Sequence, residues 1–288
     1  MKNKPNSKIP RRIWILWYQG LSEAPFIVKK CITSWKNENP NWDVIVLDKD
    51  NLNDYIDDAL PSKKMKKLSF TKRSDLFRLQ LLAKFGGVWA DATTLCMKPL
   101  DDWIDEYAGS GFFAFSKPGK DRILSSWFIA GSKDCPIIKK WNEYFIAHFC
   151  RNHFNIESSL KKKMIIFLSR FFNKNIITAR FWLSPIVTKI LRIYPYFIIH
   201  YVFERVISTD YECKTIWNNT KKISADLPHK IQMIGLFSSP NEKIKSEIMK
   251  KETPIYKLTL YYDHTNYSPS TLLHFLLEGR HQIGNSIK

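Results

Sequence analysis

Two acidic residues and an arginine lie close together in the chain, in a pattern that could hold a metal ion or a charged ligand. Asp75 and Arg78 are three residues apart in a predicted helix, so they share one face of its first turn. Asp91 ends a short apolar strand, and the preceding Gly86-Gly87 permits the sharp reversal that brings these groups to one crevice. A carboxylate there can hold a divalent cation, because hard cations prefer oxygen ligands. The structural alternative is that Asp75 favours the helix dipole and pairs with Arg78, while Asp91 caps a turn.

The elements that must position these residues alternate between strand-like and helix-like patterns. The predicted elements are a strand at 12–17, a helix from Pro25 that stops at Asn39-Pro40, a strand at 42–47, a helix capped by Ser74, and a strand at 88–90. This order predicts an α/β fold with a largely parallel sheet covered by helices. Ligands bind beyond the carboxyl ends of such strands, where Trp17 and Asp91 fall.

The rest of the chain gives weaker signals. It favours strands at 111–115 and 127–130, an amphipathic helix that begins at 134–136, a strand at 230–237, a polar helix at 241–251 and a strand at 255–260.

One segment differs from the rest in charge. Residues 158–203 contain no Asp or Glu but carry eight basic residues, interleaved with large apolar side chains. Such interleaving suits a segment that lies in the plane of an anionic membrane, with its cations on headgroups and its aromatics in the acyl boundary. The alternative is an ordinary helical subdomain whose aromatics pack on the core. We expect membrane contact.

Composition limits the class of protein. The 288 residues are 44% hydrophobic and carry a formal net charge of +18, which excludes a disordered chain and favours an anionic partner, unless it reflects composition bias alone. Five cysteines without close pairs indicate a reducing compartment. No apolar run reaches the length of a spanning helix, and the run after Arg12 is too short for a signal peptide. We therefore expect a cytoplasmic protein, peripheral on the inner face of the cell membrane.

The motif residues together resemble a known family. Ser74-Asp75-x-x-Arg78, Gly86-Gly87, Asp91-x-Thr93 and the later Pro99 are similar to the sugar-nucleotide signature of GT-A glycosyltransferases, in the bacterial capsular polysaccharide synthesis branch near glycosyltransferase family 32. Further segments match the same family: 9–20, Ser34-Trp35, Asn39-Pro40, 126–131, Pro228-His229 and 257–259.

The resemblance implies a GT-A fold, Rossmann-like, with a helical insert, and a hexosyltransferase. It would move a hexose from a nucleotide sugar, a UDP-sugar, to a lipid-linked or cell-surface glycan, with retention of configuration and with Mn²⁺ or Mg²⁺. We expect a nucleotide-sugar-binding core at 1–150, a basic helical insert at 151–210 on the membrane or acceptor side, and a C-terminal part at 211–288 that completes the site.

The resemblance also assigns roles to residues. Asp91, Asp75 and Arg78 would be catalytic, with Asp91 on the metal and the other two on the donor sugar, while Trp17 would stack on the base. The metal site would combine Asp91 with Thr93 and His229. The full predicted nucleotide-sugar site is Trp17, Tyr18, Gln19, Ser74, Asp75, Arg78, Gly87, Ala90, Asp91, Thr93, Trp127 and Lys257.

One departure from the wider family concerns the metal. Relatives carry Asp-x-Asp, whereas this chain has Asp91-Ala92-Thr93, and threonine supplies no second anionic oxygen. Metal affinity should therefore be lower unless His229, Asp263 or His264 contributes. A cation such as Lys257 would stabilise the leaving diphosphate. No carboxylate pair is securely placed as in glycosidases, so front-face attack by the acceptor hydroxyl is the hypothesis.

Three other functions are weighed against this one. A basic nucleic-acid-binding protein without catalysis would explain the charge, but no zinc-finger, RNA-recognition or helix-turn-helix pattern is present, and we expect no nucleic-acid partner. A kinase is not favoured, because the chain lacks the glycine-rich phosphate-binding loops of that class. A purely scaffolding role, without catalysis, would follow if Thr93 marked an inactive site.

Overall fold

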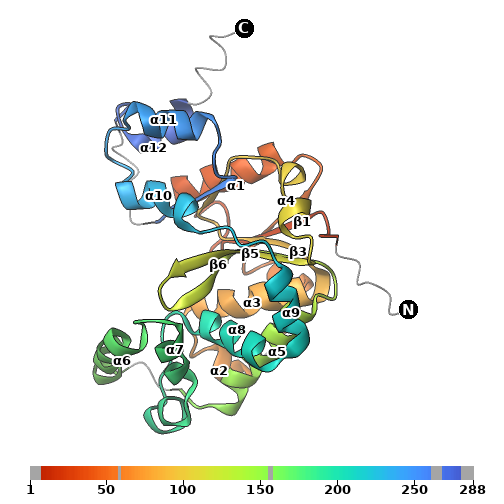
Figure 1. The fold of residues 1–288 in the computed structure, drawn as a ribbon, viewed down its shortest axis with the longest axis vertical. Helices are drawn as coiled ribbons and strands as arrows, with labels where there is room; N and C mark the ends of the chain where they lie inside the picture. The colour runs from red at the N-terminus through yellow and green to blue at the C-terminus, as the bar shows by residue number, and fades with distance from the viewer. Residues whose placement is uncertain (1–7, 58–59, 155–157, 261–267, 280–288) are drawn as a thin grey trace.

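A five-stranded sheet lies between two groups of helices in the computed structural model, which describes residues 8–57, 60–154, 158–260 and 268–279 (Figure 1). The strand order is β2-β1-β3-β6-β5. The bounds are β1 (Arg12–Leu16), β2 (Asp43–Leu47), β3 (Gly87–Ala90), β5 (Phe112–Gly119) and β6 (Arg122–Gly131). A second, two-stranded sheet joins β4 (Thr94–Cys96) to β7 (Ile255–Lys257).

The strand directions confirm the predicted fold class. β1 pairs in parallel with β2 and β3, whereas β6 runs antiparallel to both β3 and β5, so β6 alone is reversed within this sheet. The carboxyl ends of β1 and β3 therefore meet at one edge of the sheet, as the sequence predicts for Trp17 and Asp91.

Helices cover both faces of the sheet, and side chains alternate between the two faces along each strand. Ile13 and Ile15 of β1 pack in the core on the side of α1, while Trp14 packs with Leu79 and Trp141 on the other side. The first group of helices is α1 (Phe26–Glu38), α4 (Ile104–Tyr107), α10 (Asp226–Ile234), α11 (Glu242–Met249) and α12 (Leu272–His274). The second is α2 (Ser62–Met65), α3 (Phe70–Phe85), α5 (Pro136–Arg151), α8 (Ile198–Thr209) and α9 (Tyr211–Asn219). Two short 3-10 helices, η1 (Leu52–Asp54) and η2 (Leu100–Asp102), and one π-helix, η5 (Phe275–Gly279), lie between or after these elements.

The helix that carries the motif begins earlier than predicted. Ser69, not Ser74, is the N-cap of α3, since its hydroxyl accepts a hydrogen bond from the backbone N–H of Lys72 at 3.4 Å. Asp75 and Arg78 therefore lie in the second and third turns, and Lys72 precedes them at the same three-residue spacing. Because the first turn is largely polar, the apolar periodicity of the sequence begins only after the helix has started.

Two glycines bring α3 directly into β3. Gly86 ends the helix at φ +66°, and Gly87 follows at φ +95°. A Cβ on Gly87 would lie 2.6 Å from the carbonyl oxygen of Arg12, so glycine is required where β3 passes β1. The predicted reversal at this pair is confirmed.

Two predicted strands in the C-terminal part need correction. Residues 230–237 do not form a strand: most of them belong to α10, in which the buried Pro228 and Ile231 follow a helical spacing, and Gly235 (φ +98°) ends it. The strand predicted at 255–260 is only three residues long. The predicted strands at 111–115 and 127–130 are longer and form one hairpin, β5–β6.

The acid-free segment is helical, as predicted. It forms α6 (Ser159–Phe172), α7 (Ile176–Ala179), η3 (Arg180–Leu183), the π-helix η4 (Ile186–Leu191) and the start of α8. A small core of its own includes Trp182, Val187 and Tyr201, whereas α6 has no fully buried residue. α8 packs on α5 and β6, so the predicted insert at 151–210 extends into the helices beside the sheet. The three-part division itself stays a prediction.

Hydropathy adds one observation about the helices. In the described part of the chain, no helix has both the length and the apolar composition needed to cross a bilayer.

Candidate active site

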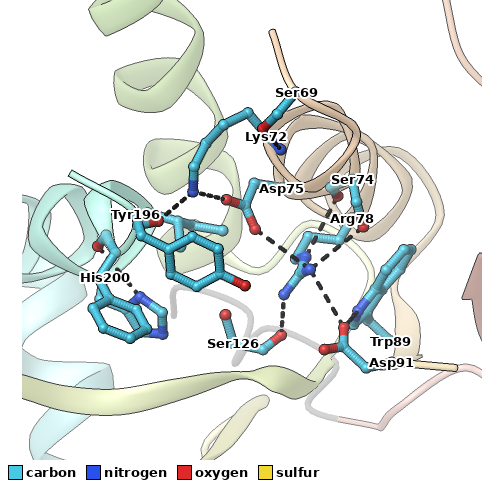
Figure 2. Close-up of polar contacts among 12 residues, drawn as sticks. Ser69, Lys72, Ser74, Asp75, Arg78, Trp89, Asp91, Ser126, Tyr196 and His200 are labelled. Atoms are coloured by element: carbon cyan, nitrogen blue, oxygen red, sulfur yellow. Dashed lines mark hydrogen bonds and ion pairs between the residues drawn. The ribbon is translucent and has the colours of Figure 1, made fainter. Parts of the chain in front are cut away.

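Five side chains of alternating charge form a row at the carboxyl edge of the sheet. Lys72 Nζ lies 2.6 Å from Asp75 Oδ2, and Arg78 Nη2 lies 3.4 Å from Asp75 Oδ1. The same Nη2 lies 3.3 Å from Asp91 Oδ1, and Lys257 Nζ lies 3.5 Å from Asp91 Oδ2. Figure 2 shows Arg78 between the two carboxylates, with Lys72 beyond Asp75. The predicted motif is thus one connected network.

Arg78 is the most firmly held member of the row. Its Nη1 donates to the carbonyl oxygen of Ser126 at 2.5 Å, and its Nε and Nη2 reach the carbonyl and hydroxyl oxygens of Ser74 at 3.4 Å (Figure 2). The guanidinium also lies over the Trp89 ring, 5.0 Å from its centroid. Only 5% of its side chain is exposed. A planar fork that bonds in several directions at once gives Arg78 one fixed position.

Asp91 is fixed by its neighbours and still reaches solvent. Its backbone N–H donates to Trp127 O at 2.8 Å, and Trp89 Nε1 donates to its Oδ1 at 2.9 Å. The backbone N–H and the hydroxyl of Thr94 both donate to the Asp91 carbonyl, which closes the turn after β3. With 27% of its side chain exposed, Asp91 is the carboxylate of the row that a ligand can contact most readily.

Lys257 reaches the site through the small second sheet. In that sheet Thr94 and Lys257 are direct partners, and Leu258 N–H donates to Thr93 O at 2.8 Å. The Lys257 ammonium donates to the Thr93 hydroxyl and faces Asp91. The C-terminal part, which the sequence predicts to complete the site, thus contributes Lys257 to this row.

A cavity of about 660 Å³ opens along this row. Its charged lining residues are four basic side chains and two carboxylates: Lys72, Arg78, Arg122, Lys257, Asp75 and Asp91. The lining thus carries an excess of two positive charges, which favours an anionic ligand. Two buried polar atoms of its wall, Ser125 Oγ and Trp127 Nε1, have no hydrogen-bond partner in the described residues.

Two histidines in the cavity are kept neutral by their surroundings. Burial, and then the charges of Arg122, Lys72 and Arg78, lowers the pKa of His200 well below its usual value. Burial, and then Lys257 and Arg122, lowers the pKa of His229. Both rings are therefore neutral at physiological pH, and the positive excess comes from lysine and arginine.

The structure brings together part of the predicted site. The cavity lining includes Asp75, Arg78, Asp91, Trp127, His229 and Lys257. Thr93 and Ser74 are not in this lining, but they contact Lys257 and Arg78, which are. Ala90 is only the strand residue before Asp91.

The other predicted residues lie outside this lining. Trp17 directly follows β1, and its indole N–H has no partner in the described chain. Tyr18 lines a separate cavity of about 190 Å³, and Gln19 is exposed. Gly87 begins β3, at the opposite end from Asp91, where its close approach to Arg12 is a structural role. Base stacking by Trp17 stays a prediction.

Several residues of the cavity were missed in the sequence. Lys72 has a signal, since it precedes Asp75 by the same three residues that separate Asp75 from Arg78. Arg122 lies on the β5–β6 hairpin, and Tyr196 and His200 lie at the start of the α8 region. These three come together only through the tertiary fold, so no local pattern marks them.

The predicted metal ligands do not form a set that fits a divalent cation. In the described ranges no three His, Cys, Asp or Glu side chains gather as a metal site requires. Of the three predicted ligands only Asp91 is anionic, and it already faces Arg78 and Lys257. The Thr93 hydroxyl accepts a hydrogen bond from Lys257. Asp263 and His264 lie outside the described residues. The need for Mn²⁺ or Mg²⁺ stays a prediction.

Comparison with known proteins identifies relatives of this chain. A family model described as capsular polysaccharide synthesis protein matches residues 1–169. An O-glycosyltransferase, braB, of Annulohypoxylon truncatum is 29% identical over 155 residues, which cover 47% of this chain and 37% of that protein. The initiation-specific alpha-1,6-mannosyltransferase of Candida albicans is 31% identical over 104 residues, 33% of this chain and 27% of that protein. The chain thus spans well under half the length of these relatives.

One solved structure completes the comparison. The PaToxG glycosyltransferase has a TM-score of 0.37 and 14% identity, over 74% of this chain and 88% of that one. A likeness at this level carries no argument about activity.

Proposed function

Since the chain belongs to the capsular polysaccharide synthesis protein family, we propose that it is a hexosyltransferase that uses a nucleotide sugar, a UDP-sugar. The observation that carries the proposal is the 660 Å³ cavity, in which Arg78 and Asp91 form one rigid unit within a positively charged lining. Cations suit the diphosphate of such a donor, and carboxylates suit the hydroxyls of its sugar. The relatives named as glycosyltransferases support the same class.

The proposed reaction exchanges one bond at the anomeric carbon. The bond from C1 to the diphosphate oxygen breaks, and its electron pair stays on that oxygen. The acceptor hydroxyl oxygen bonds to C1, and its proton passes to the departing phosphate. Lys257 and Arg78 stabilise the growing negative charge, while Asp91 orients the sugar.

The surroundings of Asp75 support front-face attack with retention of configuration. Both of its oxygens are engaged, one by Lys72 and one by Arg78, and its side chain is only 4% exposed. A carboxylate held in this way is a poor nucleophile, because attack would break two ion pairs in a buried site. Asp75 therefore acts by positioning Arg78.

The donor can be identified with a panel of nucleotide sugars, scored by thermal stabilisation and by release of nucleoside diphosphate. We expect a UDP-hexose to stabilise the protein most. A ligand at 100 times its Kd adds about 2.7 kcal/mol of stability, which raises Tm by several degrees in a chain of this size. The proposal is wrong if no nucleotide sugar in the panel changes Tm or releases a diphosphate.

For the acceptor side, we propose that the acid-free segment binds an anionic membrane, where the chain meets a lipid-linked or cell-surface glycan. Large apolar side chains are exposed along it: Leu160, Ile166, Phe167, Phe171, Ile177, Phe181, Ile186, Ile190 and Tyr196. Of its eight basic residues only Arg180 is paired with a carboxylate in the described chain, with Glu204 at 2.7 Å. The combination of unpaired cations and exposed aromatics suits an anionic bilayer surface.

This segment also reaches the cavity. Tyr196 is 63% exposed and lines the cavity, and its carbonyl oxygen accepts a hydrogen bond from the buried Lys72 (Figure 2). A membrane on the acid-free segment would therefore lie close to the cavity, within reach of a lipid-linked acceptor.

Vesicle sedimentation tests the membrane proposal. Replacing Lys161, Lys162 and Lys163 with glutamine should weaken binding to anionic vesicles about 100-fold, at about 1 kcal/mol per lysine. The matched control removes the same charge elsewhere, through Lys214→Gln, Lys243→Gln and Lys250→Gln, which are exposed lysines on or beside α9 and α11. If both triple variants bind alike, or if binding ignores lipid charge, the segment has another role.

A further inference from the structure

A lysine contacts the residue that stands where a metal-binding signature would place a second acidic ligand. Thr93 stands two residues after Asp91, and its hydroxyl contacts Lys257 Nζ rather than offering an anionic oxygen. The same ammonium lies 3.5 Å from Asp91 Oδ2. A positive charge therefore already contacts two of the three side chains that the resemblance assigns to the metal.

We propose that Lys257 is a built-in cation that takes the place of a divalent metal, so that the donor diphosphate binds without metal. The proposal rests on the proposed function, because it concerns how the same cavity holds the nucleotide. It differs from the sequence prediction, in which Mn²⁺ or Mg²⁺ bridges Asp91 and the diphosphate.

The contacts of Asp91 argue against a divalent ion at this point. Its Oδ1 accepts a hydrogen bond from Trp89 Nε1 and faces Arg78 Nη2 at 3.3 Å, while its Oδ2 faces Lys257. A divalent ion on either oxygen would approach a guanidinium or an ammonium group closely, and like charges at such distances repel strongly. Mg²⁺ also requires near-octahedral oxygen coordination, to which Thr93 adds only a neutral hydroxyl.

Lys257 is positioned well enough to replace that charge. The register of β4 and β7 sets its backbone opposite Thr94, and the Leu258 N–H···O bond to Thr93 fixes the strand beyond it. Its side chain is 18% exposed, so the ammonium is partly desolvated but open to the cavity. Lysine binds phosphate as a point charge, which needs no coordination geometry. Together with Arg122, it gives the lining its excess of positive charge.

Calorimetric titration with UDP, in Mn²⁺ and separately in EDTA, tests the proposal on four proteins. We expect the wild-type Kd to agree within about twofold between the two conditions, because metal and nucleotide binding are not linked. Lys257→Met should weaken UDP binding at least about tenfold in both conditions, while Lys257→Arg retains most of the affinity. Lys245→Met, at a half-buried position of α11 where the lysine pairs with Glu242, should bind as wild type does.

Two results would overturn the inference. One is a wild-type protein that binds UDP in Mn²⁺ but loses most of that affinity in EDTA; the other is tight UDP binding by Lys257→Met in EDTA. Either result leaves the proposed glycosyltransferase standing, since UDP still binds. Absence of UDP binding in every condition, together with no response in the nucleotide-sugar panel, would instead contradict the proposed function itself.

Discussion

Replacing Asp91 with asparagine is expected to lower kcat/KM for sugar transfer by about 100- to 1,000-fold, the usual effect of removing one group that acts on the transition state. Asparagine keeps the shape of the side chain but not its charge, so Lys257 loses the carboxylate that it faces and Arg78 keeps only Asp75. The donor sugar also loses its carboxylate contact. Steady-state transfer with the preferred nucleotide sugar measures the loss.

The Asp91→Asn protein should still fold. The side chain is partly exposed, and the backbone hydrogen bonds of the turn from Asp91 to Thr94 do not involve its carboxylate. Asp134→Asn is a matched control, because Asp134 is an exposed aspartate near the start of α5 that pairs only with Lys139 among described residues. Normal turnover by Asp91→Asn, or an equal loss in Asp134→Asn, would show that the site is assigned wrongly.

The second large effect is expected at Arg78. In Arg78→Lys the positive charge is kept, but one ammonium group cannot bridge Asp75 and Asp91 while it also donates to Ser126 O. We expect transfer to fall about 100-fold, since misplacement of a positioning group costs about that much. Arg78→Met should in addition lose about 1–3 kcal/mol of stability, because the buried Asp75 keeps Lys72 but loses the guanidinium at its Oδ1.

Kinetics and urea unfolding together separate the two losses. Arg78→Lys should unfold close to the wild-type midpoint while its transfer rate falls, whereas Arg78→Met should change in both assays. Arg205→Lys, at an exposed position of α8, is the control for an arginine outside the row. If Arg78→Lys transfers at the wild-type rate, the bridging geometry of the guanidinium is not required.

The positions of Asp75, Arg78 and Asp91 are predicted well by the sequence, because local rules determine them. Three-residue spacing put Asp75 and Arg78 on one helix face, and an apolar strand put Asp91 at the carboxyl edge of the sheet. The start of α3 was misplaced, since both Ser69 and Ser74 are good N-cap residues and the first turn, Phe70 to Arg73, is largely polar.

The rest of the cavity depends on contacts that sequence patterns do not encode. Arg122 and His200 reach the cavity because the β5–β6 hairpin and α8 pack against each other. β4 and β7 are each three residues long, too short for an alternating pattern, yet their register sets the place of Lys257. The sequence predicts a strand around Ile231, although Asp226 and Pro228 in the first turn favour the helix that forms.

The pairing of β4 with β7 has a consequence for the order in which the protein becomes competent during its synthesis. Thr93 and Lys257 are 164 residues apart, so the ribosome completes the segment that contains Asp75 and Asp91 long before it makes Lys257. A nascent chain that lacks β7 would hold Asp91 beside Arg78 but without the Lys257 ammonium. Catalytic competence would thus arrive late in translation, when a strand of three residues docks.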